Sequence, residues 1–121
     1  MILKDKFYTL NSLTHQNELI EASITIDANH EIFNGHFPGN PVTPGVVQME
    51  IIKELLSTHF KRQVQLTKMN TCKFLAILNP TETPNVNVKL SILPNETDSV
   101  KISGQISSDF ATFFKIQAEY N

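Results

Sequence analysis

The chain has 121 residues, enough for one domain with a hydrophobic core (residues 1–121) and too few for two. Its 40% hydrophobic and 18% charged content is typical of a folded domain, and its net charge of −2 argues against non-specific nucleic-acid binding. Cys72 is the only cysteine, so neither an intrachain disulfide nor a thiolate metal cluster is expected. Without a membrane-length apolar run or a signal-peptide core, a soluble, cytoplasmic protein is expected.

The N-terminal part of the chain predicts one strand. Residues 1–10 suit a short strand or a segment that folds over the core, and residues 11–12 and 15–17 are polar and predict loops. Residues 18–28 then alternate between apolar and polar side chains with period two, which is typical of a half-buried β-strand. The apolar positions of this strand are Ile20, Ala22, Ile24 and Ile26.

Residues 35–50 organise the rest of the chain. Three of the four glycines and three of the six prolines fall between Gly35 and Gly45, so this segment predicts a loop with a rigidly defined backbone. The apolar segment that follows predicts a helix from about Gly45 to Phe60, with Pro44 and Gly45 at its start. The free N–H groups of a helix N-terminus can receive partial negative charge. Because His36 precedes this terminus and Glu50 follows it by one turn, the segment predicts an acid–base site.

After the helix, the pattern predicts four consecutive strands. Residues 61–79 are strand-like, and residues 85–93, 99–107 and 110–120 alternate between turns that are rich in proline, asparagine and serine. One long helix with one strand before it and four after it predicts an α+β domain. An antiparallel sheet wrapped around the helix is the simplest packing for these elements.

The loop and the start of the helix carry a long motif, Gly35-His36-Phe37-Pro38-Gly39-x-Pro41-x-x-Pro44-Gly45-Val46-x-x-x-Glu50. It resembles the signature of the hot-dog-fold β-hydroxyacyl-(acyl carrier protein) dehydratases of fatty-acid synthesis, with strong similarity over residues 29–56. The resemblance implies a central helix enclosed by a curled antiparallel sheet. It also implies a homodimer, or a trimer of such dimers, in which two sheets pair edge to edge. The histidine of each active site would come from one subunit and the acid from the other.

Carried over by position, the resemblance assigns His36 as the catalytic histidine and Glu50 as the catalytic acid. The backbone N–H of Gly45 would polarise the thioester carbonyl. A neutral imidazole suits removal of the α proton, a preorganised amide suits the developing oxyanion, and a protonated carboxyl group suits the departing hydroxyl. No metal or organic cofactor is expected, because the thioester supplies the activation. The residues expected to line the substrate site are Phe37, Pro44 and Val46.

Several of these residues also allow plainer interpretations. Glu50 shares a helical face with Lys53, Glu54 and Ser57. Glu–Lys pairs three residues apart are common on solvent-exposed helix faces, so Glu50 could belong to such a face. Gln48 could contact substrate or face solvent. A basic cluster could dock an acidic acyl carrier protein with its phosphopantetheine arm, or it could be scattered surface charge. This cluster consists of Lys53, Lys61, Arg62 and Lys68.

The remaining titratable residues are expected to be structural. His15, His30 and His59 have no metal-ligand spacing, so no metal site is expected. Cys72 in a strand is expected to be a small buried hydrophobe.

The chain departs from the family pattern in two places. The family's His-Arg-aromatic-Pro-Phe segment before the first strand is absent, and residues 74–82 keep only part of a later pattern. These departures concern the wall of the acyl site and chain-length preference more than the chemistry.

The resulting prediction is a lyase that converts 3-hydroxyacyl-(acyl carrier protein) to trans-2-enoyl-(acyl carrier protein). One alternative is a dehydratase of a specialised polyene or polyketide pathway, and another is a dehydratase that also isomerises its product. Glu rather than Asp at position 50 favours plain dehydration by resemblance. The alternative from another class is a non-catalytic hot-dog subunit that binds acyl chains or completes a heterodimer.

Overall fold

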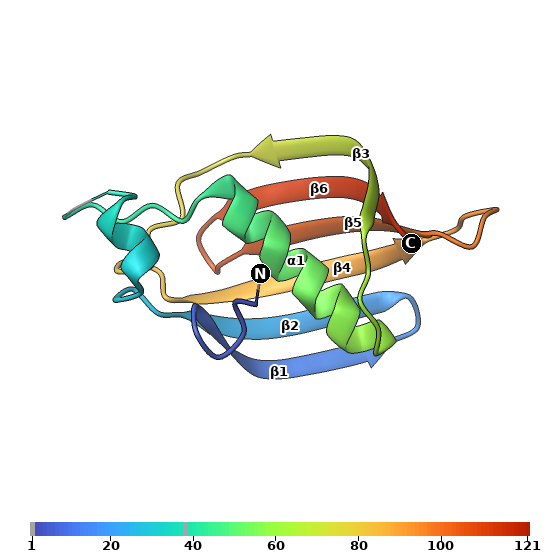
Figure 1. Ribbon diagram of the computed structural model, residues 1–121, viewed down its shortest axis with the longest axis horizontal. Helices are drawn as coiled ribbons and strands as arrows, with labels where there is room; N and C mark the ends of the chain where they lie inside the picture. The colour runs from blue at the N-terminus through green and yellow to red at the C-terminus, as the bar shows by residue number, and fades with distance from the viewer. Residues whose placement is uncertain (1, 38) are drawn as a thin grey trace.

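The computed structural model describes residues 2–37 and 39–121, and Figure 1 shows a long helix lying across one face of a curled sheet. Within the described residues the sheet has six strands. The long helix is α1 (Gly45–Phe60), and a short 3₁₀ helix, η1 (Glu31–Asn34), precedes it. The strands are β1 (Tyr8–Gln16), β2 (Leu19–Ile26), β3 (Leu66–Phe74), β4 (Asn85–Leu93), β5 (Val100–Ser107) and β6 (Thr112–Tyr120).

The strand order is β1-β2-β4-β5-β6-β3, and every pairing is antiparallel. The chain therefore leaves β2, passes through α1 across the sheet, and enters again at the opposite edge as β3 (Figure 1). This is the hot-dog fold, as the sequence predicted. Its two edge strands are β1 and β3.

The core lies between α1 and the inward face of the sheet. Strands β2, β4, β5 and β6 alternate buried and less buried positions, as period-two patterning requires. Each large apolar side chain that moves from water to this interior contributes roughly 1.5–3 kcal/mol. The helix supplies five apolar side chains that are almost fully buried: Val47, Ile51, Ile52, Leu55 and Leu56.

Both ends of α1 follow local backbone preferences. Pro44 is the N-cap residue, with φ −61° and ψ 149°, so its fixed φ suits the entry into the helix. Lys61 follows the last turn with φ 56°, and its N–H donates to the Ser57 carbonyl, which ends the helix. The predicted bounds of the helix, Gly45 to Phe60, are therefore confirmed. This helix is not long and apolar enough to cross a membrane, and no other helix in the described part of the chain is.

The strand predicted at residues 18–28 is confirmed as β2, but most of the strand before it was predicted as loop. Residues 11–12 and 15–16 were expected to be loops, but they lie in β1, so two strands rather than one precede the helix. Because β1 is an edge strand with most of its side chains exposed, its polar composition resembles that of a loop. The strand after the helix is also shorter than predicted, covering Leu66–Phe74 rather than residues 61–79.

Candidate active site

The loop between η1 and α1 holds the backbone of His36 from both sides. The His36 N–H donates to the Phe33 carbonyl (3.3 Å), and the His36 carbonyl accepts from the Val42 N–H (2.7 Å). Phe37 and Asn40 exchange two backbone hydrogen bonds of 3.1 and 2.9 Å around Gly39, whose φ of +76° favours glycine. The peptide bond between His36 and Phe37 is cis. His36 is exposed, so its imidazole lies on the surface while its backbone is held by these hydrogen bonds.

Thr43 joins this loop to the body of the protein. Its N–H donates to the Leu78 carbonyl (2.9 Å), and its carbonyl accepts from Gln48 Nε2 (3.2 Å). Gln48 is only 3% exposed, so it does not face solvent. Its side-chain amide links the first turns of α1 to the loop before the helix. Within the described residues, Gln48 Oε1 and Thr43 Oγ1 are buried without a hydrogen-bond partner.

The N-terminus of α1 presents an available amide. The N–H groups of Val47 and Gln48 both donate to the Pro44 carbonyl, whereas no described residue accepts from the N–H of Gly45. The aromatic ring of Phe74 lies directly against Gly45, because a Cβ added there would be 2.5 Å from Phe74 Cζ. A side chain at this position would therefore have to displace the Phe74 ring.

Exposed apolar side chains lie on the loop that carries His36, at the start of α1, and at and after the end of β3. Phe37 is 55% exposed, Val46 71% and Phe74 55%, while Pro44 is half-buried. Ile77 is 71% exposed and directly precedes Leu78, whose carbonyl accepts the hydrogen bond from the Thr43 N–H. Clusters of exposed apolar residues mark places where another molecule binds. The residues predicted to bind substrate thus lie where a ligand or a second subunit could cover them.

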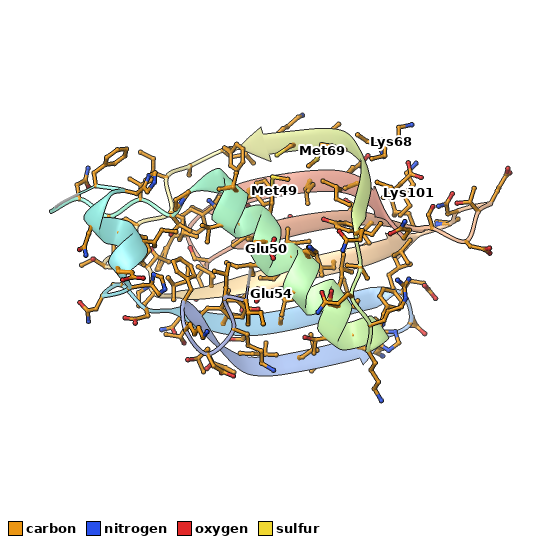
Figure 2. All side chains as sticks on the ribbon, in the orientation of Figure 1. Met49, Glu50, Glu54, Lys68, Met69 and Lys101 are labelled. Atoms are coloured by element: carbon orange, nitrogen blue, oxygen red, sulfur yellow. The ribbon has the colours of Figure 1, made fainter. Side chains whose placement is uncertain are left out.

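Glu50 lies one helical turn after Gly45 and is half-buried (Figure 2). It lines one cavity of about 240 Å³ together with Val46, Met49, Leu66 and Tyr120. Burial, followed by the negative charge of Glu50, raises the pKa of Tyr120 to about 12.

Glu50 also lines a larger cavity, of about 540 Å³, together with residues of the N-terminal segment and the end of α1. Neither of the two cavities includes His36. One chain therefore does not bring the imidazole and the carboxyl group into a common cavity.

Glu54, one turn after Glu50, holds the N-terminal segment (Figure 2). Its carboxylate accepts hydrogen bonds from the Leu3 N–H (2.7 Å), the Lys4 N–H (3.0 Å) and the Tyr8 hydroxyl (3.0 Å). Burial, reinforced by the charge of Glu54 and this hydrogen bond, raises the pKa of Tyr8 well above its ordinary value. The interpretation of this face as solvated is therefore wrong at Glu54, because residues 3–8 cover it.

The predicted basic cluster is divided between two faces of the molecule. Lys53, Lys61 and Arg62 line the 540 Å³ cavity that Glu50 shares. Lys68 lies near the start of β3, opposite Glu119 (Figure 2). Only three of the four predicted docking residues therefore gather beside the helix.

The other histidines have structural contacts. His30 Nδ1 accepts from the Ile32 N–H (3.1 Å) and caps η1. The rings of His15 and His59 pack edge to face, 4.6 Å apart, and burial followed by His15 lowers the pKa of His59. Cys72 is half-buried against the core, and burial raises the pKa of its thiol.

No group of three metal-ligating side chains occurs among the described residues.

Comparisons with known proteins identify the class. The model of the ApeI-like dehydratase family matches residues 12–113. A 3-hydroxyacyl-[acyl-carrier-protein] dehydratase FabZ of Ligilactobacillus salivarius is 32% identical over 102 residues, covering 78% of this chain and 70% of the relative. The FabZ of Lactobacillus helveticus is 25% identical over 118 residues, covering 92% of this chain and 77% of the relative.

Solved structures agree on the fold. One subunit of the dehydratase heterocomplex ApeI:P from Xenorhabdus doucetiae superposes with a TM-score of 0.77 at 17% identity, covering 93% of this chain and 96% of that one. A point mutant of the Staphylococcus aureus thioesterase SAV0944 superposes with a TM-score of 0.67 at 8% identity, covering 98% of this chain and 94% of that one. At such identities these likenesses support the hot-dog fold alone.

The fold and the histidine-bearing loop at the helix start place this protein in the hot-dog class of 3-hydroxyacyl thioester dehydratases. Within that class, the chain belongs to the ApeI-like dehydratase family.

Proposed function

We propose that the protein is a hydro-lyase that removes water from 3-hydroxyacyl groups carried on acyl carrier protein, giving trans-2-enoyl groups. The observation that carries this proposal is the arrangement of the matched motif. An ordered loop presents His36, the helix that follows begins with the available amide of Gly45, and Glu50 lies one turn further on. FabZ relatives that are named for this reaction align over most of the chain.

The three groups divide the chemistry between them. His36 removes the α proton, and the Gly45 N–H, with the helix dipole behind it, stabilises the negative charge that develops on the thioester oxygen. Glu50 donates a proton, directly or through water, to the β hydroxyl as the C–O bond breaks and water leaves. Phe37, Pro44 and Val46 are assigned to the walls around the reacting carbons.

Because neither of the two cavities that Glu50 lines includes His36, the proposal includes a dimer. Strand β3 ends the sheet, and apolar side chains are exposed at its end and on the adjoining loop. Edge-to-edge pairing along β3 would cover this surface. Each active site would then take its histidine from one subunit and its acid from the other, and such dimers could assemble further into trimers.

The experiment is a dehydration assay on 3-hydroxybutyryl and 3-hydroxydecanoyl carrier protein. Wild-type protein should form the trans-2-enoyl products, and His36→Ala should lower kcat by about 10²–10⁴-fold, the usual contribution of a positioned general base. Glu50→Gln should also lower kcat, and full activity in this variant would exclude the acid role of Glu50. Wild-type protein that is inactive on both substrates but binds acyl chains would instead identify a non-catalytic subunit.

A dehydratase of a specialised polyene or polyketide pathway is the second candidate. The match to the ApeI-like family model favours it, and so does the departure of the N-terminal segment from the general pattern. Both candidates share the same chemistry. A direct comparison of kcat/KM for saturated and polyunsaturated 3-hydroxyacyl substrates would separate them.

Docking of the carrier protein is assigned to Lys53, Lys61 and Arg62, which line one cavity beside Glu50, with Lys68 as a separate contact. Charge reversal at Lys61 and Arg62 should raise KM for carrier-bound substrate and leave a short pantetheine thioester unaffected, because only the carrier protein presents an acidic surface. Equal effects on both substrates would exclude docking at these residues.

A further inference from the structure

The face of the sheet that is turned away from α1 is more basic than the rest of the protein. Directly opposite residues on paired strands share a face, so the strand register shows which charges lie together. Five lysines and two glutamates give this face a local charge of +3, in a chain whose net charge is −2. They are Lys68, Lys73, Lys89, Lys101, Lys115, Glu21 and Glu119.

Three of these lysines line a hollow of about 400 Å³. Lys73 on β3 lies directly opposite Lys115 on β6, Lys115 lies opposite Gln105 on β5, and Gln105 lies opposite Lys89 on β4. The charges therefore form one row across four strands that are each about 4.8 Å apart. The adjacent row adds hydroxyl and amide groups to the same hollow from Thr71, Gln117, Ser103 and Ser91.

The charge in this hollow is poorly balanced by the protein itself. No acidic side chain is among its lining residues in the described part of the chain. Glu21 lies opposite Lys89, but Lys73 and Lys115 lie directly opposite each other, and like charges in this arrangement are destabilising. A bound anion would remove this repulsion.

We propose that the hollow binds a compact anion that carries at least two phosphate charges, such as a pyrophosphate group. Its volume is in the usual range for small-molecule sites, and lysines bind phosphate as point charges. An acidic protein would instead use the whole face, yet Lys68 and Lys101 both lie opposite Glu119 and are partly neutralised.

The site is separate from the proposed dehydratase site. It lies on the sheet face opposite α1, whereas Glu50 and its cavities lie on the helix side. Pairing along the β3 edge would leave the face open, because the new hydrogen bonds would lie in the plane of the sheet. Binding can therefore be measured without reference to dehydration.

Calorimetric titration of the full chain with pyrophosphate at constant ionic strength tests the proposal. Wild-type protein should show saturable binding, and Lys73→Ser or Lys115→Ser should weaken it about tenfold or more, a loss of about 1.4 kcal/mol. Lys101→Ser is the matched control, since it removes the same charge from the same face outside the hollow. This control should change the affinity less than about threefold through the long-range field alone.

Thermal unfolding gives a second measurement that does not depend on heats of binding. Pyrophosphate should raise the Tm of wild-type protein and of Lys101→Ser, and should not raise that of the Lys73→Ser/Lys115→Ser double variant. The proposal is overturned if pyrophosphate shows no saturable binding, or if Lys101→Ser weakens it as much as Lys115→Ser. Binding of a glutamate-rich peptide that pyrophosphate does not displace would also overturn it, and would indicate an acidic protein partner.

Discussion

Gly45 is the residue at which helix geometry and the proposed chemistry meet most closely. Its amide is assigned to the thioester oxygen, and the ring of Phe74 lies where a Cβ would be. That ring is 55% exposed and stacks on Phe114 with centroids 4.9 Å apart, so it can move at modest cost. Crowding at this position should therefore affect the site more than the fold.

We expect Gly45→Ala to lower kcat/KM about tenfold, which corresponds to about 1.4 kcal/mol of activation free energy. The cause would be the displaced Phe74 ring and a shifted helix start, which together move the amide at position 45. The free energy of unfolding of Gly45→Ala should differ from that of wild type by less than about 1 kcal/mol, because the higher helix propensity of alanine offsets the cost of moving the ring. Steady-state kinetics and urea unfolding measure the two effects. The double variant Gly45→Ala/Phe74→Ala should recover part of the activity, and a failure to recover would show that the ring is not the cause.

Tyr120 should make the protein sensitive to alkaline pH. Burial, then the charge of Glu50, raises its pKa from 10 to about 12 in the folded chain. Between these values the unfolded chain loses the phenolic proton while the folded chain keeps it, so stability is present below pH 10 and falls as the pH rises toward 12. Tyr120→Phe should show a smaller loss of unfolding free energy between about pH 9 and 11 in urea titrations. An unchanged slope would mean that other groups, such as Tyr8, cause the loss.

Residue types alone predicted the site only in part. The motif placed His36, Gly45 and Glu50 at a loop and a helix start, because glycine and proline have local conformational signatures. The roles of Gln48 and Glu54 were not predicted, since their partners are a carbonyl on the preceding loop and groups about fifty residues away at the N-terminus. A pattern of helical faces cannot show which face a distant segment covers.

At the scale of elements, the N-terminal segment is tied to α1 by one carboxylate. Glu54 accepts three hydrogen bonds from residues 3–8, and Leu3 and Phe7 bury their side chains in the same core. This segment also forms part of the wall of the cavity that Glu50 lines, through Ile2 and Lys4. The helix thus orders the start of the chain as well as the loop before it.

Glu54→Ala should cost about 1–3 kcal/mol of unfolding free energy, because it leaves three donors without their acceptor in a partly buried place. Tyr8→Phe removes only one of the three bonds and should cost about 1 kcal/mol. Urea unfolding measures both, with Lys53→Ala as the neighbouring control on the same helix, expected within about 0.5 kcal/mol of wild type. Equal losses in Glu54→Ala and Lys53→Ala would contradict the anchoring role.

Among the elements, strand prediction succeeded where the sequence alternates regularly between apolar and polar residues, and it failed for most of β1. Strands β2, β4, β5 and β6 alternate, because their inward side chains pack under α1. The edge strand β1 carries mostly exposed side chains and a bulge between Leu10 and Ser12, so its sequence lacks this alternation. Its pairing with β2 comes from backbone hydrogen bonds, which composition does not reveal.

For the whole molecule, the separation of His36 from Glu50 predicts complementation between inactive subunits. In a two-fold dimer with shared sites, a mixed pair of one His36→Ala and one Glu50→Gln subunit contains one intact site and one doubly altered site. Random exchange of equal amounts should therefore restore about a quarter of wild-type activity. The assay follows enoyl product after the two variants are unfolded together and refolded. Activity no higher than that of either variant alone would mean that each subunit supplies a complete site.

The order β1-β2-β4-β5-β6-β3 leaves β3 with one side of its backbone unmatched by any described strand. In the proposed dimer, a subunit that loses its neighbour on dilution would offer this row of donors and acceptors to any extended peptide it meets. Very dilute samples should therefore lose activity gradually on storage. Added acyl ligand should slow this decay if it binds between two copies and keeps them together.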